Sequence, residues 1–269
     1  MKIGIIGGGM VGGTIIKCSE DYFEVLVYDK YKKVPKRYGD NNFKEVSKCP
    51  LIFVCLPTVP TKNGKNMDIT PFEETFEKLK GNKNMIVLKS TVFPGTTRML
   101  SKKYNVPNLI FIPEFLTEKS CYADYMYPDR NVIGTLRKGM DLRILYNYFE
   151  KVNGDCPIMV KSAETAEITK FASNTFFATK VSFANMFYDI CNEHNVKWNE
   201  VKDILYLDSR IGANHFYIDK KDRGYGGFCI PKDSYQLYIK YKNKVDMSLL
   251  NAVIKQNQKY RKHKKEWEP

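Results

Sequence analysis

The chain has 269 residues, with 43 Lys and Arg against 30 Asp and Glu, which gives a formal net charge of +13. At roughly 100–200 residues per domain this length predicts two domains, and no apolar run approaches the roughly 20 residues of a membrane span. The seven cysteines form no CxxC pair and the three histidines show no ligand spacing, so we expect neither a disulfide framework nor a metal site. Because the N-terminus also lacks a signal-peptide pattern, the sequence predicts a soluble, cytoplasmic protein.

Strand and helix patterns alternate through the first half of the chain. Short apolar runs predict buried parallel strands at 3–6, 25–29, 51–56, 85–88 and 109–112. Helices are expected from the glycines after the first strand through Ser19, and at 70–80 and 96–104. Runs at 132–134 and 158–160 could extend the edge of the sheet. This alternation predicts an α/β fold, a doubly wound parallel sheet of the Rossmann type.

The pattern changes in the second half. From Ser162 to about Asn195 there is no proline or glycine, and apolar residues recur at near-helical spacing. We expect one long helix there, weakly capped by Ser162 with Thr165, of the kind that joins domains or packs across a dimer. Shorter helices are expected at 199–207, 234–243 and 247–263. The expected domains are therefore 1–161, built on the sheet, and 162–269, a small helical domain.

A glycine motif follows the first strand directly and opens a helix. In Gly7-x-Gly9-x-x-Gly12 the three glycines permit a tight turn, close approach of a pyrophosphate, and packing of helix on strand. The helix N-terminus then presents its amides to the anion. Asp29 ends the second strand and suits ribose hydroxyls, so we expect NAD rather than NADP, although Lys30, Lys32 and Lys33 close behind would favour a phosphate.

A cysteine lies in a second glycine-rich turn, Gly224-Tyr-Gly-Gly-Phe-Cys229-Ile-Pro-Lys-Asp233. The glycines allow a substrate to approach the backbone closely. Lys232 is near Cys229 in sequence, and an ammonium favours the reactive thiolate. Asp233 is expected either to cap the next helix or to handle protons. The alternative is a buried structural cysteine in a tight loop.

Further polar residues lie where a ligand could reach them. Lys170 and Asn174 are four residues apart, hence on one face of the long helix, where they could hold an oxygen that gains charge. Glu114 and Glu118 follow the fifth strand, and Ser90-Thr91 ends the fourth, at the carboxyl edge where such sheets bind ligands. For Lys170 the alternative is a lysine that only lies along an apolar face, and for the strand-end residues it is helix capping.

Together these stretches resemble the UDP-glucose/GDP-mannose dehydrogenase family along nearly the whole chain. The likeness rests on 7–12, 54–58, 90–97, 113–118, 128–130, Lys170 with Asn174, 208–212 and 224–233, in the family's order. The resemblance implies oxidation of a nucleotide sugar's primary alcohol to a carboxylate in two hydride steps with two NAD⁺, here most simply UDP-glucose to UDP-glucuronate.

The resemblance also implies a role for each site residue. Cys229 would attack the intermediate aldehyde to give a thiohemiacetal and then a thioester, which water cleaves. Lys170 and Asn174 would stabilise the oxyanion, Asp233 and Thr91 would hold the water, and Glu114 would move protons. Residues that would hold NAD are Gly7, Gly9, Met10, Val11, Gly12, Asp29, Lys30, Thr58, Thr91, Glu118 and Lys232. Residues that would contact the sugar nucleotide are Glu114, Phe115, Leu116, Lys170, Asn174, Arg210, Tyr225 and Gly226.

Assembly and completeness follow from the same resemblance. In the family the arginine matched by Arg210 reaches across a dimer formed around the long helix, so a homodimer is expected. The family also has a third domain that binds much of the nucleotide, and this chain stops near the helix that leads to it, so a separate chain could replace that domain. Lys119 stands where the family usually has glycine.

Two other functions stay open on the sequence. A β-hydroxyacid dehydrogenase shares the glycine loop and the Lys-x-x-x-Asn helix, but performs one oxidation and needs no Cys229. A non-catalytic, dimerising protein could retain NAD binding alone. The positive charge is typical of attraction to anionic small molecules. Nucleic-acid binding is the alternative there, but the basic stretch 259–265 has no accompanying reading motif.

Overall fold

The computed structural model describes residues 1–61, 64 and 66–261. It contains two compact units, one made of residues 1–58 and 68–170, the other of residues 59–67 and the chain from Phe171 onward. Residues 262–265 of the basic stretch considered above for nucleic-acid binding, His263 among them, and the end of the helix expected at 247–263 lie outside the described residues.

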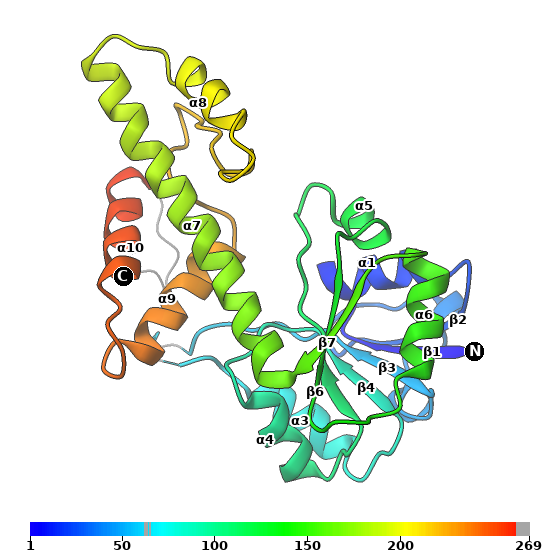
Figure 1. Cartoon of the computed structure of the whole chain (residues 1–269). Coiled ribbons are helices and arrows are strands. Elements are labelled where there is room, and N and C mark those ends of the chain that lie inside the picture. The colour runs from blue at the N-terminus through cyan, green and yellow to red at the C-terminus, as the bar shows by residue number, and fades with distance from the viewer. Residues whose placement is uncertain (62–63, 65, 262–269) are drawn as a thin grey trace. The chain divides into compact units, whose positions relative to one another are not determined.

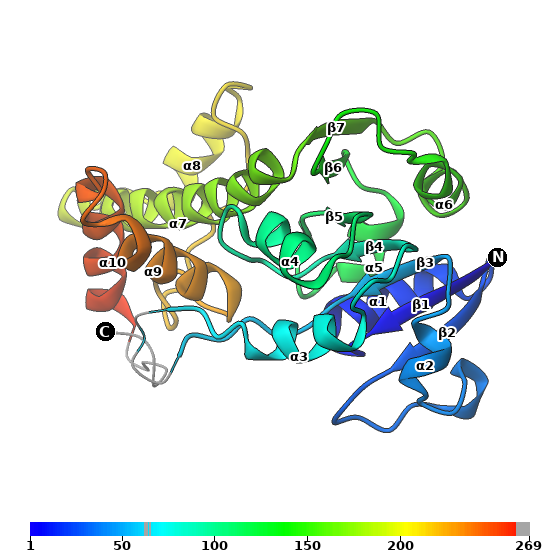
Figure 2. The ribbon, with the colours of Figure 1, turned by 90° about the horizontal axis from the view of Figure 1, so that it is seen from below.

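The first unit is built on one sheet, whose strands are labelled in Figures 1 and 2. Its strands are β1 (Lys2–Ile6), β2 (Glu24–Tyr28), β3 (Leu51–Val54), β4 (Met85–Leu88), β5 (Leu109–Phe111), β6 (Asn131–Thr135) and β7 (Ile158–Ser162). In the described part of the chain they pair in the order β2-β1-β3-β4-β5-β6-β7. The strands β1 to β5 are parallel, as expected, and the order reverses at β1, which is typical of a doubly wound sheet.

The far edge of the sheet departs from the expected parallel arrangement. Strand β6 is antiparallel to β5 and parallel to β7. The connection 112–130 carries the short helix α5 (Cys121–Met126) and returns to the sheet at the edge where β5 ended, so β6 runs in the opposite direction. A parallel continuation would have needed a crossover to the other edge.

Helices cover both faces of this sheet (Figures 1 and 2). On one face, α1 (Met10–Ser19), α5 and α6 (Arg143–Asn153) share a core with the strands, and the fully buried Tyr148 hydroxyl lies 2.9 Å from both Ser19 Oγ and Tyr125 Oη. On the other face lie α2 (Phe43–Val46), α3 (Thr70–Lys78) and α4 (Thr96–Tyr104), and a 3-10 turn spans Lys36–Tyr38. The carboxyl ends of the parallel strands β1 to β5 lie at one edge of the sheet. The loops that follow these strands therefore emerge between the two helical layers.

The long helix α7 (Ala163–Glu193) follows β7 without a loop. Its expected cap is confirmed, because Ser162 Oγ accepts a hydrogen bond from the Thr165 amide at 3.1 Å. From Phe171 onward α7 belongs to the second unit, with α8 (Trp198–Tyr206), α9 (Cys229–Tyr241) and α10 (Ser248–Tyr260). Among its described residues, two small cores hold this unit, one around Trp198 and Phe216, the other around Ala178, Tyr225 and Val253.

The start of α9 differs from the expectation of a helix from residue 234. The helix begins at Cys229, because Pro231 lies in its first turn, where a proline needs no amide hydrogen bond. Asp233 is therefore one turn inside the helix, and the prediction that it caps α9 is wrong.

No helix in the described ranges is long and apolar enough to span a membrane, and no cluster of metal-ligating side chains occurs among those residues.

Candidate functional site

The glycine turn after β1 has the shape of an anion cradle. A Cβ at Gly12 would overlap the carbonyl oxygen of Gly7, which itself has φ +95°, so both positions require glycine. At Gly9 no atom lies within 4 Å of the position a Cβ would take, which leaves open space over the turn. Helix α1 begins there without a side-chain cap and without an acidic residue in its first turn. Its N-terminal amides at Met10 and Val11 therefore suit a phosphate.

Asp29 ties the end of β2 to this cradle. Its carboxylate accepts the Gly8 amide at 2.7 Å and the amides of Tyr31 and Lys32 at 2.8 Å. Burial opposes the charge, but the three amides outweigh it and lower the pKa of Asp29. Lys30, predicted to hold the cofactor, forms an exposed ion pair with Glu74 (2.8 Å). It is Lys32 whose ammonium contacts the cradle, at 3.3 Å from the Gly8 carbonyl oxygen.

A buried ion pair lies at the carboxyl ends of β4 and β5. Lys89 Nζ is 2.8 Å from Glu114 Oε2, and Glu114 Oε1 accepts the Phe115 amide at 3.0 Å. Lys89 is 5% exposed and was missed by the sequence reasoning, although a charge that ends the apolar run 85–88 was a usable signal. The pair holds the Glu114 carboxylate in one orientation at the end of β4, where Ser90 and Thr91 follow Lys89 in the chain.

The Phe115 ring joins this cluster to the start of α7. The Arg130 guanidinium lies 4.6 Å and the Lys170 ammonium 5.6 Å from the ring centroid, both within the range of cation–π contacts. Lys170 is buried. The structure thus brings together the predicted Glu114, Phe115 and Lys170. The other predicted residues of this unit are placed as follows: Thr58 is buried just after β3, Thr91 is half-buried, Leu116 packs against the core, and Glu118 is exposed.

In the second unit, Cys229 is exposed at the N-terminus of α9. One turn further on, Lys232 Nζ lies 2.6 Å from Asp233 Oδ1, and the Asn174 amide donates to Asp233 Oδ2 at 2.5 Å. All three of these side chains are buried. Lys232, predicted to hold NAD, is thus paired with Asp233. The helix N-terminus on which Cys229 lies is itself an environment that favours a thiolate.

Three buried cysteines of the chain have thiols with a raised pKa. Cys18 and Cys55 are buried, and burial raises the pKa of each thiol to about 12. Burial likewise raises the pKa of Cys49 to about 11. Since the thiolate is the nucleophile, these three are inert at neutral pH.

The loop that leads to Cys229 is anchored by helix α10. Asn257 pairs with both backbone groups of Tyr225, accepting its amide at 2.7 Å and donating to its carbonyl at 3.1 Å. Gly224 has φ +81°, and a Cβ there would overlap the Asn257 side chain. The predicted Tyr225 ring is buried with Ala178 and Val253. Asn257 was missed by the sequence reasoning, although an amide on the buried face of α10 was a signal.

Two further contacts place the remaining predicted residues of this unit. Gly226 lies against the Arg261 guanidinium, which pairs with Asp222 at 2.7 Å. Arg210 is exposed, and its guanidinium pairs with the nearby Asp208 carboxylate at 2.6 Å. Neither residue is part of the buried Asn174–Asp233–Lys232 cluster.

Known proteins resemble this chain in both units. Residues 33–151 match the sequence model of the UDP-glucose/GDP-mannose dehydrogenase family, NAD binding domain, and residues 164–259 match that of the same family, central domain. A UDP-glucose 6-dehydrogenase from Campylobacter jejuni is 31% identical over 233 residues, which cover 84% of this chain and 58% of that protein. One from Streptococcus pneumoniae is 29% identical, over 96% of this chain and 73% of that protein.

Among solved structures, a UDP-glucose dehydrogenase from the archaeon Pyrobaculum islandicum superposes with a TM-score of 0.81 at 25% identity, over 96% of this chain and 68% of that one. The chain thus spans between 58% and 73% of the length of these relatives.

Proposed function

Because the chain belongs to the UDP-glucose/GDP-mannose dehydrogenase family and has its NAD binding domain, we propose that it oxidises UDP-glucose to UDP-glucuronate through a covalent adduct on Cys229. The observation that carries the proposal is an exposed thiol at a helix N-terminus, one turn from the buried Asn174–Asp233–Lys232 cluster. A single two-electron oxidation would have no use for such a thiol, whereas an aldehyde intermediate would.

The cofactor is NAD, and the cradle fits it. Gly7, Gly9 and Gly12 would accept the pyrophosphate over α1, and the Asp29 carboxylate stands at the end of β2, where a ribose would lie. When bound, NAD⁺ takes hydride from the sugar carbon, and the complete oxidation consumes two NAD⁺ and one water and yields a carboxylate, two NADH and three protons.

The remaining chemistry belongs to the side chains of the chain. Cys229 Sγ would form a bond to the aldehyde carbon, and Lys170 and Asn174 would stabilise the negative oxygen of that adduct. After the second oxidation the adduct is a thioester. Water held by Asp233 and Thr91 would then break the C–S bond, which releases the carboxylate and returns the thiol. Glu114, oriented by Lys89, would take up the protons released in these steps.

The first test is an NADH-release assay with UDP-glucose, GDP-mannose and UDP-N-acetylmannosamine, with the acid product identified. We expect two NADH per UDP-glucose and no free aldehyde. Cys229→Ser should block completion of the oxidation, because serine lacks a thiolate. Cys156→Ser, at a half-buried cysteine of the first unit, is the matched control and should retain full turnover.

Other outcomes would point elsewhere. Full turnover by Cys229→Ser would refute the role of the thiol. One NADH per substrate would favour a single oxidation, of the β-hydroxyacid type. NAD binding by calorimetry without turnover of any nucleotide sugar would indicate a non-catalytic protein.

We further propose that the chain divides near residue 161 into an NAD-binding and a helical domain, and that it forms a homodimer through α7. The first proposal is supported by the family matches, which end at 151 and resume at 164. The second is supported by large apolar side chains exposed along α7, among them Phe176, Phe183 and Met186. Arg210 is exposed and lies outside the buried Asn174–Asp233–Lys232 cluster of its own chain. In such a dimer it would contact the substrate bound by the partner chain.

A further inference from the structure

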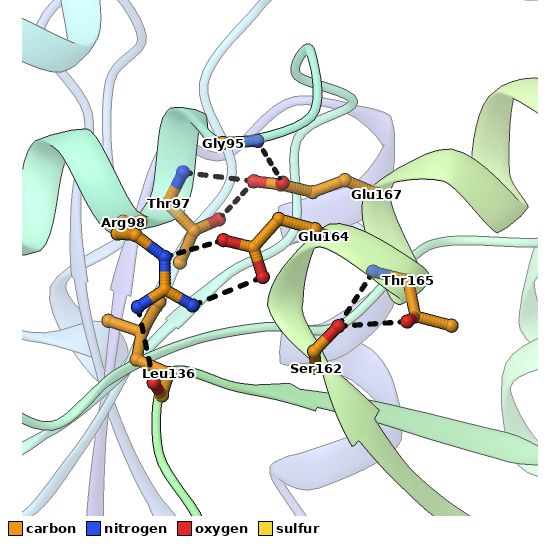
Figure 3. Close-up of polar contacts among 8 residues, drawn as sticks. All are labelled: Gly95, Thr97, Arg98, Leu136, Ser162, Glu164, Thr165 and Glu167. Atoms are coloured by element: carbon orange, nitrogen blue, oxygen red, sulfur yellow. Dashed lines mark hydrogen bonds and ion pairs between the residues drawn. The ribbon is translucent and has the colours of Figure 1, made fainter.

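Glu167 is a fully buried carboxylate that no role assigned above uses. It projects from the second turn of α7 to the start of α4, as Figure 3 shows. Its Oε2 accepts the Gly95 amide at 2.6 Å, and its Oε1 accepts the Thr97 amide at 2.9 Å and the Thr97 hydroxyl at 2.6 Å. Three donors from one short segment therefore converge on one side chain.

These contacts replace the local cap of α4. The N-cap position is Gly95, with φ +91° and no side-chain cap hydrogen bond. A serine or aspartate as the N-cap residue of a helix satisfies an amide such as that of Thr97 at little cost, because it keeps its own side chain near water. Burying a carboxylate from another helix is costlier, and burial raises the pKa of Glu167 against the effect of its three donors. The contact therefore does more than cap the N-terminus of α4: it couples α7 to the segment before α4.

Both coupled elements carry residues of the proposed reaction. Lys170 lies three residues after Glu167, on the same face of α7, and its ammonium contacts the Phe115 ring. The segment that Glu167 holds continues back through Pro94 and Phe93 to Thr91 at the end of β4. A shift of α7 by a fraction of a turn would move Lys170 and release this segment together.

We propose that Glu167 is a positioning residue, which holds the 91–97 segment and the first turns of α7 in one register and so sets Thr91 and Lys170 for the reaction. The inference rests on the proposed function, since it assumes that these two residues act on one substrate. It adds to that function a residue that touches neither substrate nor cofactor.

The same two helices offer a matched control. Glu164, one turn earlier on α7, pairs with Arg98 of α4, with Nε to Oε1 at 2.6 Å and Nη2 to Oε2 at 3.2 Å (Figure 3). This pair also bridges α7 and α4, but its Arg98 and Glu164 side chains are 54% and 31% exposed, and ion pairs open to solvent contribute little to stability. Glu164→Gln therefore makes the same chemical change at the same interface without touching the segment 91–97.

The experiment compares Glu167→Gln with Glu164→Gln in steady-state kinetics with UDP-glucose and NAD⁺. In Glu167→Gln one amide of the α4 N-terminus must face an NH₂ group, whichever way the side chain turns. We expect kcat to fall about tenfold, equivalent to about 1.4 kcal/mol, with the KM for UDP-glucose nearly unchanged. Glu164→Gln should keep both constants. A kcat loss in Glu167→Gln that merely follows its unfolded fraction, measured by circular dichroism, would overturn the proposal.

A readout that needs no turnover separates this inference from the proposed function. Hydrogen–deuterium exchange should become faster at 91–97 and at 164–170 in Glu167→Gln, and in Glu164→Gln it should stay at the wild-type rate in 91–97. Unchanged exchange in Glu167→Gln would overturn the proposal. Absence of turnover in the wild-type chain would refute the proposed function alone, and the exchange comparison would still decide whether Glu167 holds the two segments.

Discussion

At the residue scale, the three amide contacts of Asp29 predict how the unfolding free energy of the chain changes at acid pH. Their effect lowers the pKa of Asp29 in the folded chain. A carboxyl whose folded pKa lies below its unfolded value of about 3.9 stabilises the fold above that pH and loses the effect as pH falls through the folded pKa. Asp29→Asn should thus cost about 1–3 kcal/mol of unfolding free energy at neutral pH. The difference from wild type should shrink as pH falls from about pH 5 through the lowered folded pKa.

Urea denaturation at several pH values measures this difference. Asp21→Asn, at an exposed aspartate of the same unit, serves as the control and should leave the unfolding free energy unchanged. A difference between Asp29→Asn and wild type that stays constant from neutral to acid pH would show that the carboxylate charge is not what holds the cradle.

Residues of the site divide into those that the sequence could indicate and those that it could not. Cys229 and the glycines of both turns carry local signals, because their neighbours define a tight backbone. Lys89, Glu167 and Asn257 act through partners that are distant in sequence: Glu167 reaches Thr97, 70 residues away, and Asn257 reaches Tyr225, 32 residues away. Such pairs become visible only when the fold brings the elements together.

At the element scale, most elements with a regular hydrophobic period could be predicted from the sequence, with helix α6 as an exception. The parallel strands and the long helix were placed within a few residues, because a buried strand and a proline-free helix both have plain patterns. Helix α6 was missed although Leu145, Tyr148, Phe149 and Val152 repeat at helical spacing. The start of α9 was missed because the glycine-rich stretch and Pro231 both read as loop.

The anchoring of the cysteine loop by α10 is testable at this scale. Asn257→Leu would keep an apolar packing face but leave the amide and carbonyl of Tyr225 without these partners. We expect a loss of about 1–3 kcal/mol in unfolding free energy and faster tryptic cleavage after Arg223. Asn251→Leu, at a half-buried asparagine of the same helix, is the control. Equal protease resistance in the two variants would mean that α10 does not hold the loop.

At the scale of the whole molecule, the surface of the second unit shows where a partner would bind. Phe176, Phe183, Met186 and Ile190 of α7 are 60%, 42%, 41% and 44% exposed and lie on one face of the helix. Phe183 and Met186 also line a groove of 430 Å³ between α7 and α10, with Leu249 and Val253 opposite. Contiguous apolar patches of this kind often mark interaction sites, whereas single exposed apolar residues are common on any protein surface.

If this face is the homodimer interface, charge placed on it should separate the chains. In the double variant Phe183→Glu, Met186→Glu, dimerisation would bury two carboxylates without partners in each chain. The free energy needed to remove these charges from water should exceed what an interface of standard size supplies. In sedimentation velocity we expect the wild-type chain at twice the mass of one chain and the double variant at the mass of one. Leu207→Glu, at an apolar residue that is 85% exposed beyond α8, should leave the dimer intact. A wild-type monomer, or a double variant that still dimerises, would show that this face does not pair two chains.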